Sequence, residues 1–278
     1  MPNSIRGLVL AARAPLYLAL AILVFWSLTT VSVFLLPDWQ TSIDLSLMFA
    51  TPSLSHWFGY DDLGRSIGVR VLTGAATSIS VALAVVSITA VVGTSFGICI
   101  AWFGRYIDMI GVRIIDIFLA FPGILLAIAL AAVLGPGIDN VIFALVAVSW
   151  VGFARLARAQ TLSVKQRDHV QVALALGTST MTIIRRHLLP LIAAPLIVEA
   201  TFAIAAVIIA EAGLSFLGLG VQPPTPSWGS MIKQGTQYLL IAPHMVVAPG
   251  LALFSMVFAI NILGDRLRDR LQVKETHL

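Results

Sequence analysis

The stretch 166–190, QRDHVQVALALGTSTMTIIRRHLLP, is a polar interruption between two strongly apolar segments of the chain. Asp168 followed by Gln171 is typical of a helix N-cap with a capping-box partner. Gly177 can adopt the positive φ that ends a helix. The residues between them therefore predict a short helix with a broad apolar surface that stops at Gly177.

A second short helix is predicted after this glycine. Thr178 or Ser179 can cap its N-terminus, and Pro190 can begin the next segment because its missing N–H is not needed there. One side of this helix carries Ile183, Ile184 and Leu188, and the other carries Arg185, Arg186 and His187. The stretch predicts a helix–turn–helix outside the bilayer that offers an apolar face to a partner. An ordinary loop between membrane helices is the alternative.

The composition identifies an integral membrane protein. Of the 278 residues, 59% are hydrophobic and 11% are charged, and the mean hydropathy is +0.97. Soluble domains carry roughly 25% charged residues, and a water-soluble fold could not bury so much apolar surface. The basic residues are not gathered into one soluble domain, so no nucleic-acid partner is expected. The single cysteine, Cys99, excludes a disulfide framework and a Cys-based metal site.

Six apolar runs are long enough to cross a bilayer as helices. They fall at 16–36, 77–103, 114–134, 141–161, 191–211 and 244–264. The first follows a basic N-terminus, but it is too long for the core of a signal peptide and lacks a cleavage site, so we expect it to be retained. Pro122 interrupts the third run. The expected fold is one all-α integral membrane domain over residues 1–278.

The distribution of Lys and Arg predicts the orientation of the chain. Fourteen of the 17 basic residues fall on one side of the predicted membrane, in the N-terminal segment, the 104–113 and 155–190 loops and the C-terminal tail. That side is expected to be cytoplasmic, together with both termini and the helix–turn–helix. Two longer loops, 37–76 and 212–243, are expected to face outward.

Few residues are available for chemistry. The sequence has no P-loop, H-E-x-x-H or G-x-S-x-G motif, so nothing points to an ATP site or a hydrolytic centre. Polar groups at membrane depth are the default candidates for a translocation path, namely Glu199, Glu211 and Asn261. Glu199 fits a wall of a water-filled path or a structural carboxylate. Glu211 also fits a helix-end anchor, and Asn261 also fits an interhelical hydrogen bond.

The segment 171–190 resembles the EAA loop of ABC-importer permeases, whose pattern is EAA-x3-G-x9-I-x-LP. The residues that match in register are Ala173, Gly177, Leu189 and Pro190. The residues that depart from the pattern are Gln171, Val172 and His187, which replace Glu, Ala and Ile.

Three further stretches resemble the dipeptide/oligopeptide/nickel permease family. They are GYDDLGRS at 59–66, EAGLSFLGLGVQPPTPSWG at 211–229 and GDRLRD at 264–269. The family residues in the two outer loops are Asp61, Asp62, Gly64, Arg65, Pro223, Pro224 and Trp228. Tyr60 and Ser66 depart from the GTDDLGRD of the family. The likeness covers residues 50–272 and is greatest to the C-type member of the permease pair.

This resemblance implies the type I ABC-importer permease fold, with six transmembrane helices and a cytoplasmic coupling helix pair at about 163–190. It also implies a bacterial cytoplasmic membrane location, a sister permease in a heterodimer, two ATPase subunits and an extracytoplasmic binding protein. ATP and Mg would bind to the ATPases, so this chain would have no cofactor, metal or catalytic residue of its own. The implied coupling residues are Asp168, Val170, Gln171, Ala173, Leu174, Leu176, Gly177, Thr178, Arg185, Arg186, Leu189 and Pro190. We expect Val170, Ala173, Leu174 and Leu176 to fill a groove of one ATPase, and Arg185 and Arg186 to meet its acidic groups.

Three functions remain open at this point. The first is the permease subunit of a peptide-class importer, the second an ion-driven secondary transporter with Glu199 as its coupling carboxylate, and the third an intramembrane enzyme or assembly scaffold. For the first, the expected cargo is a short peptide, and nickel or a metal chelate is the alternative.

Overall fold

The computed structural model describes residues 2–35, 42–54 and 56–275, and most of these residues are helical. The helices are α1 (Pro2–Leu35), α2 (Ile67–Phe103), α3 (Arg105–Leu119), α4 (Gly123–Leu134), α5 (Ile138–Lys165), α6 (Asp168–Ala175), α7 (Thr180–Ile183), α8 (Leu189–Phe216), α9 (Trp228–Thr236) and α10 (His244–Glu275). Residues 36–41, which belong to the predicted first span and first outer loop, lie outside the described part. The predicted all-α membrane fold is confirmed.

Five continuous helices in the described residues are long and apolar enough to cross a membrane. They are Pro15–Val33, Ile67–Phe103, Ile138–Lys165, Thr180–Phe216 and His244–Leu271. The pair α3 and α4 would make a sixth crossing, but the two helices are bent by 80° at the break between them. The predicted run 114–134 is thus interrupted, as the sequence predicted, and its first helix begins earlier, at Arg105.

The break in this pair lies where the sequence predicted it, at Pro122. Its backbone is extended, with φ −59° and ψ 118°, and it forms the N-cap of α4. Proline lacks the N–H that would continue the ladder of α3, and it disfavours helical backbone in the residue before it. The predicted 104–113 loop is also corrected, because α3 begins at Arg105, directly after Gly104 at φ +61°.

The outer loops are shorter than predicted because helices extend into them. The helix α2 begins at Ile67 rather than at residue 77, α8 continues to Phe216, and α9 occupies Trp228–Thr236. Hydropathy does not detect the first turns of α2 because Arg70 lies there. In the structure this arginine is buried and forms an ion pair with Asp61.

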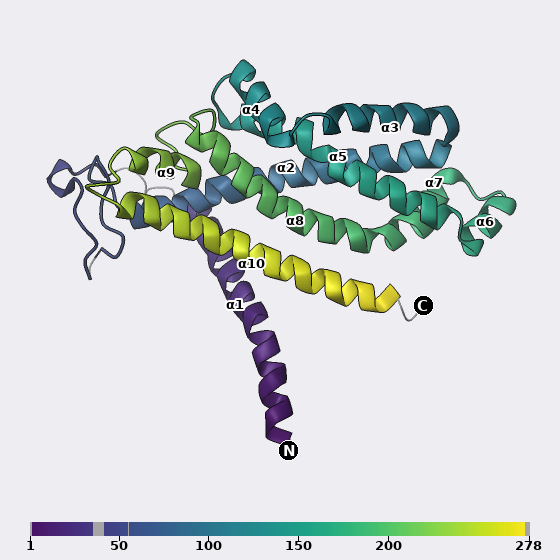
Figure 1. Cartoon of the computed structure of the whole chain (residues 1–278), viewed down its shortest axis with the longest axis horizontal. Helices are drawn as coiled ribbons and strands as arrows, with labels where there is room; N and C mark the ends of the chain where they lie inside the picture. Colours follow the sequence, from purple (N-terminus) through teal and green to yellow (C-terminus); the bar gives the residue numbers. More distant parts are fainter. Residues whose placement is uncertain (1, 36–41, 55, 276–278) are drawn as a thin grey trace.

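The axes of the long helices α2, α5, α8 and α10 are roughly aligned, and α8 runs antiparallel to the other three, as Figure 1 shows. The helices α6 and α7 lie at one end of this bundle, α9 lies at the other end, and α1 diverges from α10 toward the N-terminus (Figure 1). The closest packing joins α2 to α5, because Gly93 and Gly97 let the two backbones approach. This bundle holds the α6–α7 segment and the outer loops at opposite ends.

Candidate functional site

The helix α6 is anchored to the bundle by its inward face. Val170 and Ala173 are buried and pack in a cluster with residues of five neighbouring segments. The other members are Ile98, Trp102, Ala157, Val164, Ile183, Leu188 and Ile192. The expectation that Val170 and Ala173 fill the groove of a partner is therefore wrong, since both side chains are used within this chain.

The outward face of the segment is apolar and exposed. Leu176 is 80% exposed, Val172 and Met181 are each 57% exposed, and Leu174 is 37% exposed. Leu174 and Leu176 are thus available for contact, as predicted. The sequence analysis did not include Val172 or Met181 among the contact residues. For Val172 a signal was available, because its i, i+4 spacing to Leu176 places both side chains on one face of the helix.

The turn between the two short helices follows the prediction for Gly177. Its φ is +76°, and its N–H donates to the carbonyl of Leu174 at 3.0 Å. The N–H of Thr178 donates to the carbonyl of Ala173, also at 3.0 Å, which completes a Schellman motif. Ser179 caps α7, because its Oγ accepts from the N–H of Thr182 at 3.4 Å.

The predicted capping box at the start of α6 is wrong. Asp168 is the first helical residue, and the N-cap is Arg167, whose side chain makes no capping bond. Gln171 instead donates from Nε2 to the carbonyl of Lys165 at 2.7 Å. The Lys165 ammonium group donates in turn to the carbonyl of Trp102 at 2.6 Å. An ionised glutamate could not donate to a carbonyl, so the glutamine at this position has a physical explanation.

The second short helix does not end before the next span, as the helix–turn–helix prediction required. A π-helical turn, Ile184–Leu188, joins α7 to α8, and Pro190 lies in the first turn of α8 beside Leu189. Because proline has no N–H to continue the ladder, the change of hydrogen-bond pattern in the π-helical turn directly before it accommodates Pro190. Arg185 and Arg186 are exposed, as predicted. The α6–α7 segment therefore combines an apolar outward face with two exposed positive charges.

At the other end of the bundle, Asp61 organises the first outer loop. Its carboxylate accepts from the N–H groups of Leu63 and Arg65, both at 2.9 Å, and from Nε of Arg65 at 2.8 Å. It also forms a buried ion pair with Arg70, whose other terminal nitrogen donates to Gln234 in α9 at 2.9 Å. The loop, the start of α2 and α9 are thus one connected polar network.

Further polar and close contacts join the neighbouring residues of this loop. Asp62 lies 3.7 Å from the guanidinium of Arg65, and its Oδ1 accepts no hydrogen bond among the described residues. Gly64 has φ +67° and packs on the backbone of Asp44. Hydrogen bonds from Ser46 hold the pKa of the Asp44 carboxyl below its usual value.

The second outer loop is fixed by Trp228. Its side chain is fully buried, and its indole N–H donates to the carbonyl of Val71 at 3.0 Å. Its ring also meets the ring of Trp26 edge to face at 5.1 Å. Pro223 and Pro224, joined by a cis peptide bond, precede it. Trp228 therefore packs α9 against α1 and α2.

Two of the three predicted path residues are engaged within the chain. Glu211 is fully buried, and its carboxylate accepts from the hydroxyls of Ser78 at 2.8 Å and Ser215 at 2.7 Å. This carboxylate joins α8 to α2 through Ser78. Asn261 donates to the carbonyl of Val257 in its own helix at 2.8 Å, so the expected interhelical hydrogen bond is not formed.

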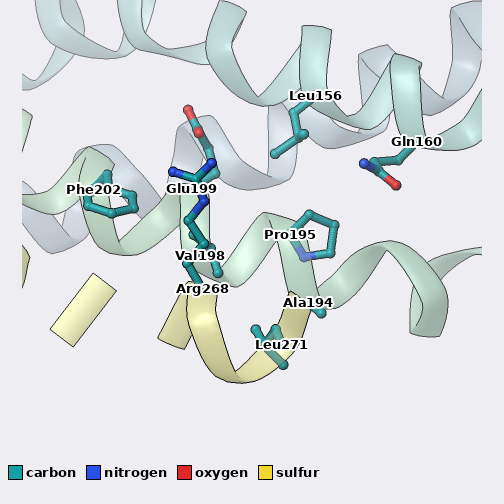
Figure 2. A pocket seen from close by; sticks show the side chains of 9 residues that line it. All are labelled: Leu156, Gln160, Ala194, Pro195, Val198, Glu199, Phe202, Arg268 and Leu271. Carbon is teal, nitrogen blue, oxygen red and sulfur yellow. The ribbon is translucent and has the colours of Figure 1, made fainter. Parts of the chain in front are cut away.

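Glu199 has a different environment. It lines a pocket of about 450 Å³ between α5, α8 and α10. Gln160 and Arg268 line the same pocket with mostly apolar neighbours, and Figure 2 shows the Arg268 side chain rising from α10 toward α8. Sequence reasoning missed Gln160 and Arg268. For Arg268 a signal was available, because this arginine follows the sixth apolar run closely enough to lie on the same helix.

Comparison with known proteins supports one family. A profile of the family described as "Binding-protein-dependent transport system inner membrane component" matches residues 93–275. The chain is 46% identical over 237 residues to the glutathione transport system permease proteins GsiD of Escherichia coli O157:H7 and Shigella sonnei. These alignments cover 85% of this chain and 78% of each relative.

A likeness to solved structures supports the fold. An inward-facing structure of the MetNI methionine ABC transporter superposes with a TM-score of 0.58 at 20% identity, over 72% of this chain and 95% of that chain. At this identity the likeness concerns the fold alone. With the family profile and the close relatives, the chain belongs to the binding-protein-dependent transport system inner membrane components, the permease subunits of ABC importers.

Proposed function

We propose that this chain forms half of the translocation path of an ATP-driven importer of short peptides. The observation that carries the cargo class is the 46% identity to permeases named for glutathione, which is a tripeptide. The chain is proposed to have no enzymatic activity or cofactor of its own. ATP and Mg would bind to partner subunits.

The α6–α7 segment is the proposed contact with an ATPase subunit. Its exposed apolar side chains, Val172, Leu176 and Met181, suit a groove, while Arg185 and Arg186 at its edge suit acidic groups around that groove. Closure of the ATPase dimer would displace this segment and tilt the bundle between inward-open and outward-open states. The buried Val170 and Ala173 would transmit the displacement rather than receive the partner.

The other proposed partners would bind at the two ends and along the sides of the bundle. A sister permease would complete the path as a heterodimer, and membrane lipid would cover the other apolar faces. Two ATPase subunits would lie at the α6–α7 end, and an extracytoplasmic binding protein would dock on the outer loops. In this arrangement both termini lie in the cytoplasm, in agreement with the excess of basic residues at that end.

Reconstitution in proteoliposomes tests the proposal. We expect uptake of radiolabelled glutathione or trialanine only when the sister permease, the ATPases, the binding protein and ATP are all present. An ion-driven transporter would instead move cargo through this chain alone under a proton gradient. Such uptake without ATPase subunits would refute the importer role, and ATP-dependent uptake of nickel but not of peptide would refute the cargo class.

A further inference from the structure

Three polar side chains face the pocket between α5, α8 and α10 without a partner. Among the described residues, Gln160, Glu199 and Arg268 form no side-chain hydrogen bond and no ion pair within 4.0 Å. Glu199 and Gln160 are only partly exposed, whereas Arg268, which lines the same pocket, is exposed. Polar groups in such surroundings are costly unless water or a ligand satisfies them. The pocket is therefore suited to a polar occupant.

The helix α5 leaves space for the carboxylate of Glu199. A β-carbon on Gly152 of α5 would lie 2.9 Å from Oε1 of Glu199. The glycine leaves room for the carboxylate at the wall of the pocket. On the far side of the pocket, the ring of Phe202 packs against Gly264 of α10, where a β-carbon would lie 3.0 Å from the ring. Close contacts thus hold both α8, which carries Glu199, and α10, which carries Arg268, in place around the pocket.

The charges define the chemistry of the occupant. A carboxylate accepts hydrogen bonds from an ammonium group, and a guanidinium donates two parallel hydrogen bonds to a carboxylate. Gln160 can both donate to and accept from an amide. The volume of about 450 Å³ lies within the range of roughly 300–1,000 Å³ typical of small-molecule sites. A zwitterion with an internal amide offers a complementary group to each of the three side chains.

We propose that this pocket is a transient binding site for a short peptide with free termini, in which Glu199 receives the α-ammonium group and Arg268 receives the α-carboxylate. Gln160 pairs with the peptide bond between them, and the apolar walls accept side chains of varied shape. This assignment rests on the proposed function, because it takes the cargo to be a peptide.

The site lies in the half of the bundle that carries the α6–α7 segment. Gln160 is close to the end of α5, Glu199 is in the first half of α8, and Arg268 is near the end of α10. Figure 1 places these helix ends beside α6, α7 and the C-terminus. In the proposed orientation a peptide would reach this site after the binding protein has released it, so the contacts select for free termini at the exit.

The test uses the complete permease–ATPase complex in phosphatidylcholine nanodiscs, without nucleotide or binding protein. Binding of trialanine, N-acetyl-trialanine and trialanine amide is measured by saturation-transfer NMR titration, which detects weak binding. Loss of one charge-assisted contact should weaken binding by about tenfold for each blocked peptide relative to trialanine. Equal affinity for the three peptides would overturn the proposal.

Substitutions of the two charged residues test which of them binds each terminus of the peptide. Glu199→Gln should weaken binding of trialanine and of its amide, but leave binding of the N-acetyl peptide unchanged. Arg268→Gln should show the converse pattern, sparing only the amide. Arg270→Gln, two positions away on α10 and outside this pocket, is the matched control and should bind all three peptides as the wild type does. A variant effect that is the same for all three peptides would show a merely structural role and refute the assignment.

Uptake assays separate failure of the site from failure of the proposed function. Import of trialanine by a complex whose variants show no terminus preference would refute the site and leave the function intact. Terminus-selective binding in a complete complex that imports no peptide would support the site and refute the peptide-import function.

Discussion

Asp61 concentrates more interactions than any other side chain of the first outer loop described here. It receives two backbone N–H groups and two guanidinium groups while being 1% exposed. Removal of one partner of a buried ion pair leaves the other charge uncompensated, at a cost of about 3–5 kcal/mol. The loop and the first turn of α2 thus depend on this one carboxylate.

We therefore expect Asp61→Asn to lower the thermal midpoint of the purified protein in detergent, with a loss of roughly 3 kcal/mol. Asp62→Asn is the matched control, since Oδ1 of Asp62 accepts no hydrogen bond among the described residues and lies 3.7 Å from the Arg65 guanidinium. Its loss should stay below about 1 kcal/mol. Equal midpoints for the two variants would contradict the role of Asp61.

Gly177 allows a clean test of backbone conformation. Its φ is +76°, and a β-carbon there would meet no atom within 4 Å. Gly177→Val should therefore cost about 1–2 kcal/mol through backbone strain alone and distort the α6–α7 turn. Insertion in the membrane should be preserved, while stimulation of the partner ATPases by cargo should fall sharply. Gly177→Asn, which tolerates a positive φ, should retain most of the stimulation, and full stimulation in the Val variant would refute the coupling role of the turn.

At the scale of elements, the α2–α5 contact depends on glycine. A β-carbon on Gly97 would lie 2.9 Å from Cβ of Ala157 and would overlap the carbonyl of Ala154. Gly97→Ala should therefore destabilise the bundle by about 1–3 kcal/mol. Gly213→Ala in α8 is the control, because a β-carbon there meets nothing within 4 Å and alanine favours the helix. Thermal denaturation in detergent should separate the two variants; a destabilised Gly213 variant with an unaffected Gly97 variant would contradict this packing.

The elements show how much the sequence could predict. Long apolar runs reveal membrane helices because a helix in lipid must be apolar over its length. The start of α2 was missed because Arg70 looks incompatible with a span until its partner Asp61 is known. The first turn of α3 likewise contains a charge, Asp108, that looks unsuited to a membrane helix. Its partner is Arg158 of α5 at 2.6 Å, which the sequence does not reveal.

The residues of the candidate site were also only partly predictable from the sequence. The turn at Gly177 was predictable because positive φ is a local property of the residue. The direction of Val170 was not, since periodicity gives the faces of a helix but not which face meets the bundle. That Glu199 of α8 and Arg268 of α10 line one pocket depends on tertiary packing, which the spacing of residues in the sequence does not reveal.

At the scale of the whole molecule, the single cysteine makes the orientation testable. In a Cys99→Ser background, Leu240→Cys and Leu176→Cys place thiols at opposite ends of the bundle, at positions that are 100% and 80% exposed. A membrane-impermeant maleimide should label position 240 in intact spheroplasts and position 176 only after permeabilisation. The reverse pattern would invert the proposed topology.

The π-helical turn at Ile184–Leu188 has a consequence for how α7 and α8 move. It makes Thr180–Phe216 one uninterrupted helix of 37 residues, about 55 Å long at 1.5 Å per residue. One end carries Met181 of the proposed ATPase contact, and the other carries Glu211 and Ser215 beneath the outer loops. Its hydrogen-bond ladder is altered at the π-helical turn and at Pro195, and these are the positions at which a helix bends. We therefore expect a displacement at the ATPase contact to bend this helix between Ile184 and Pro195, while the part that carries Glu211 moves as one unit.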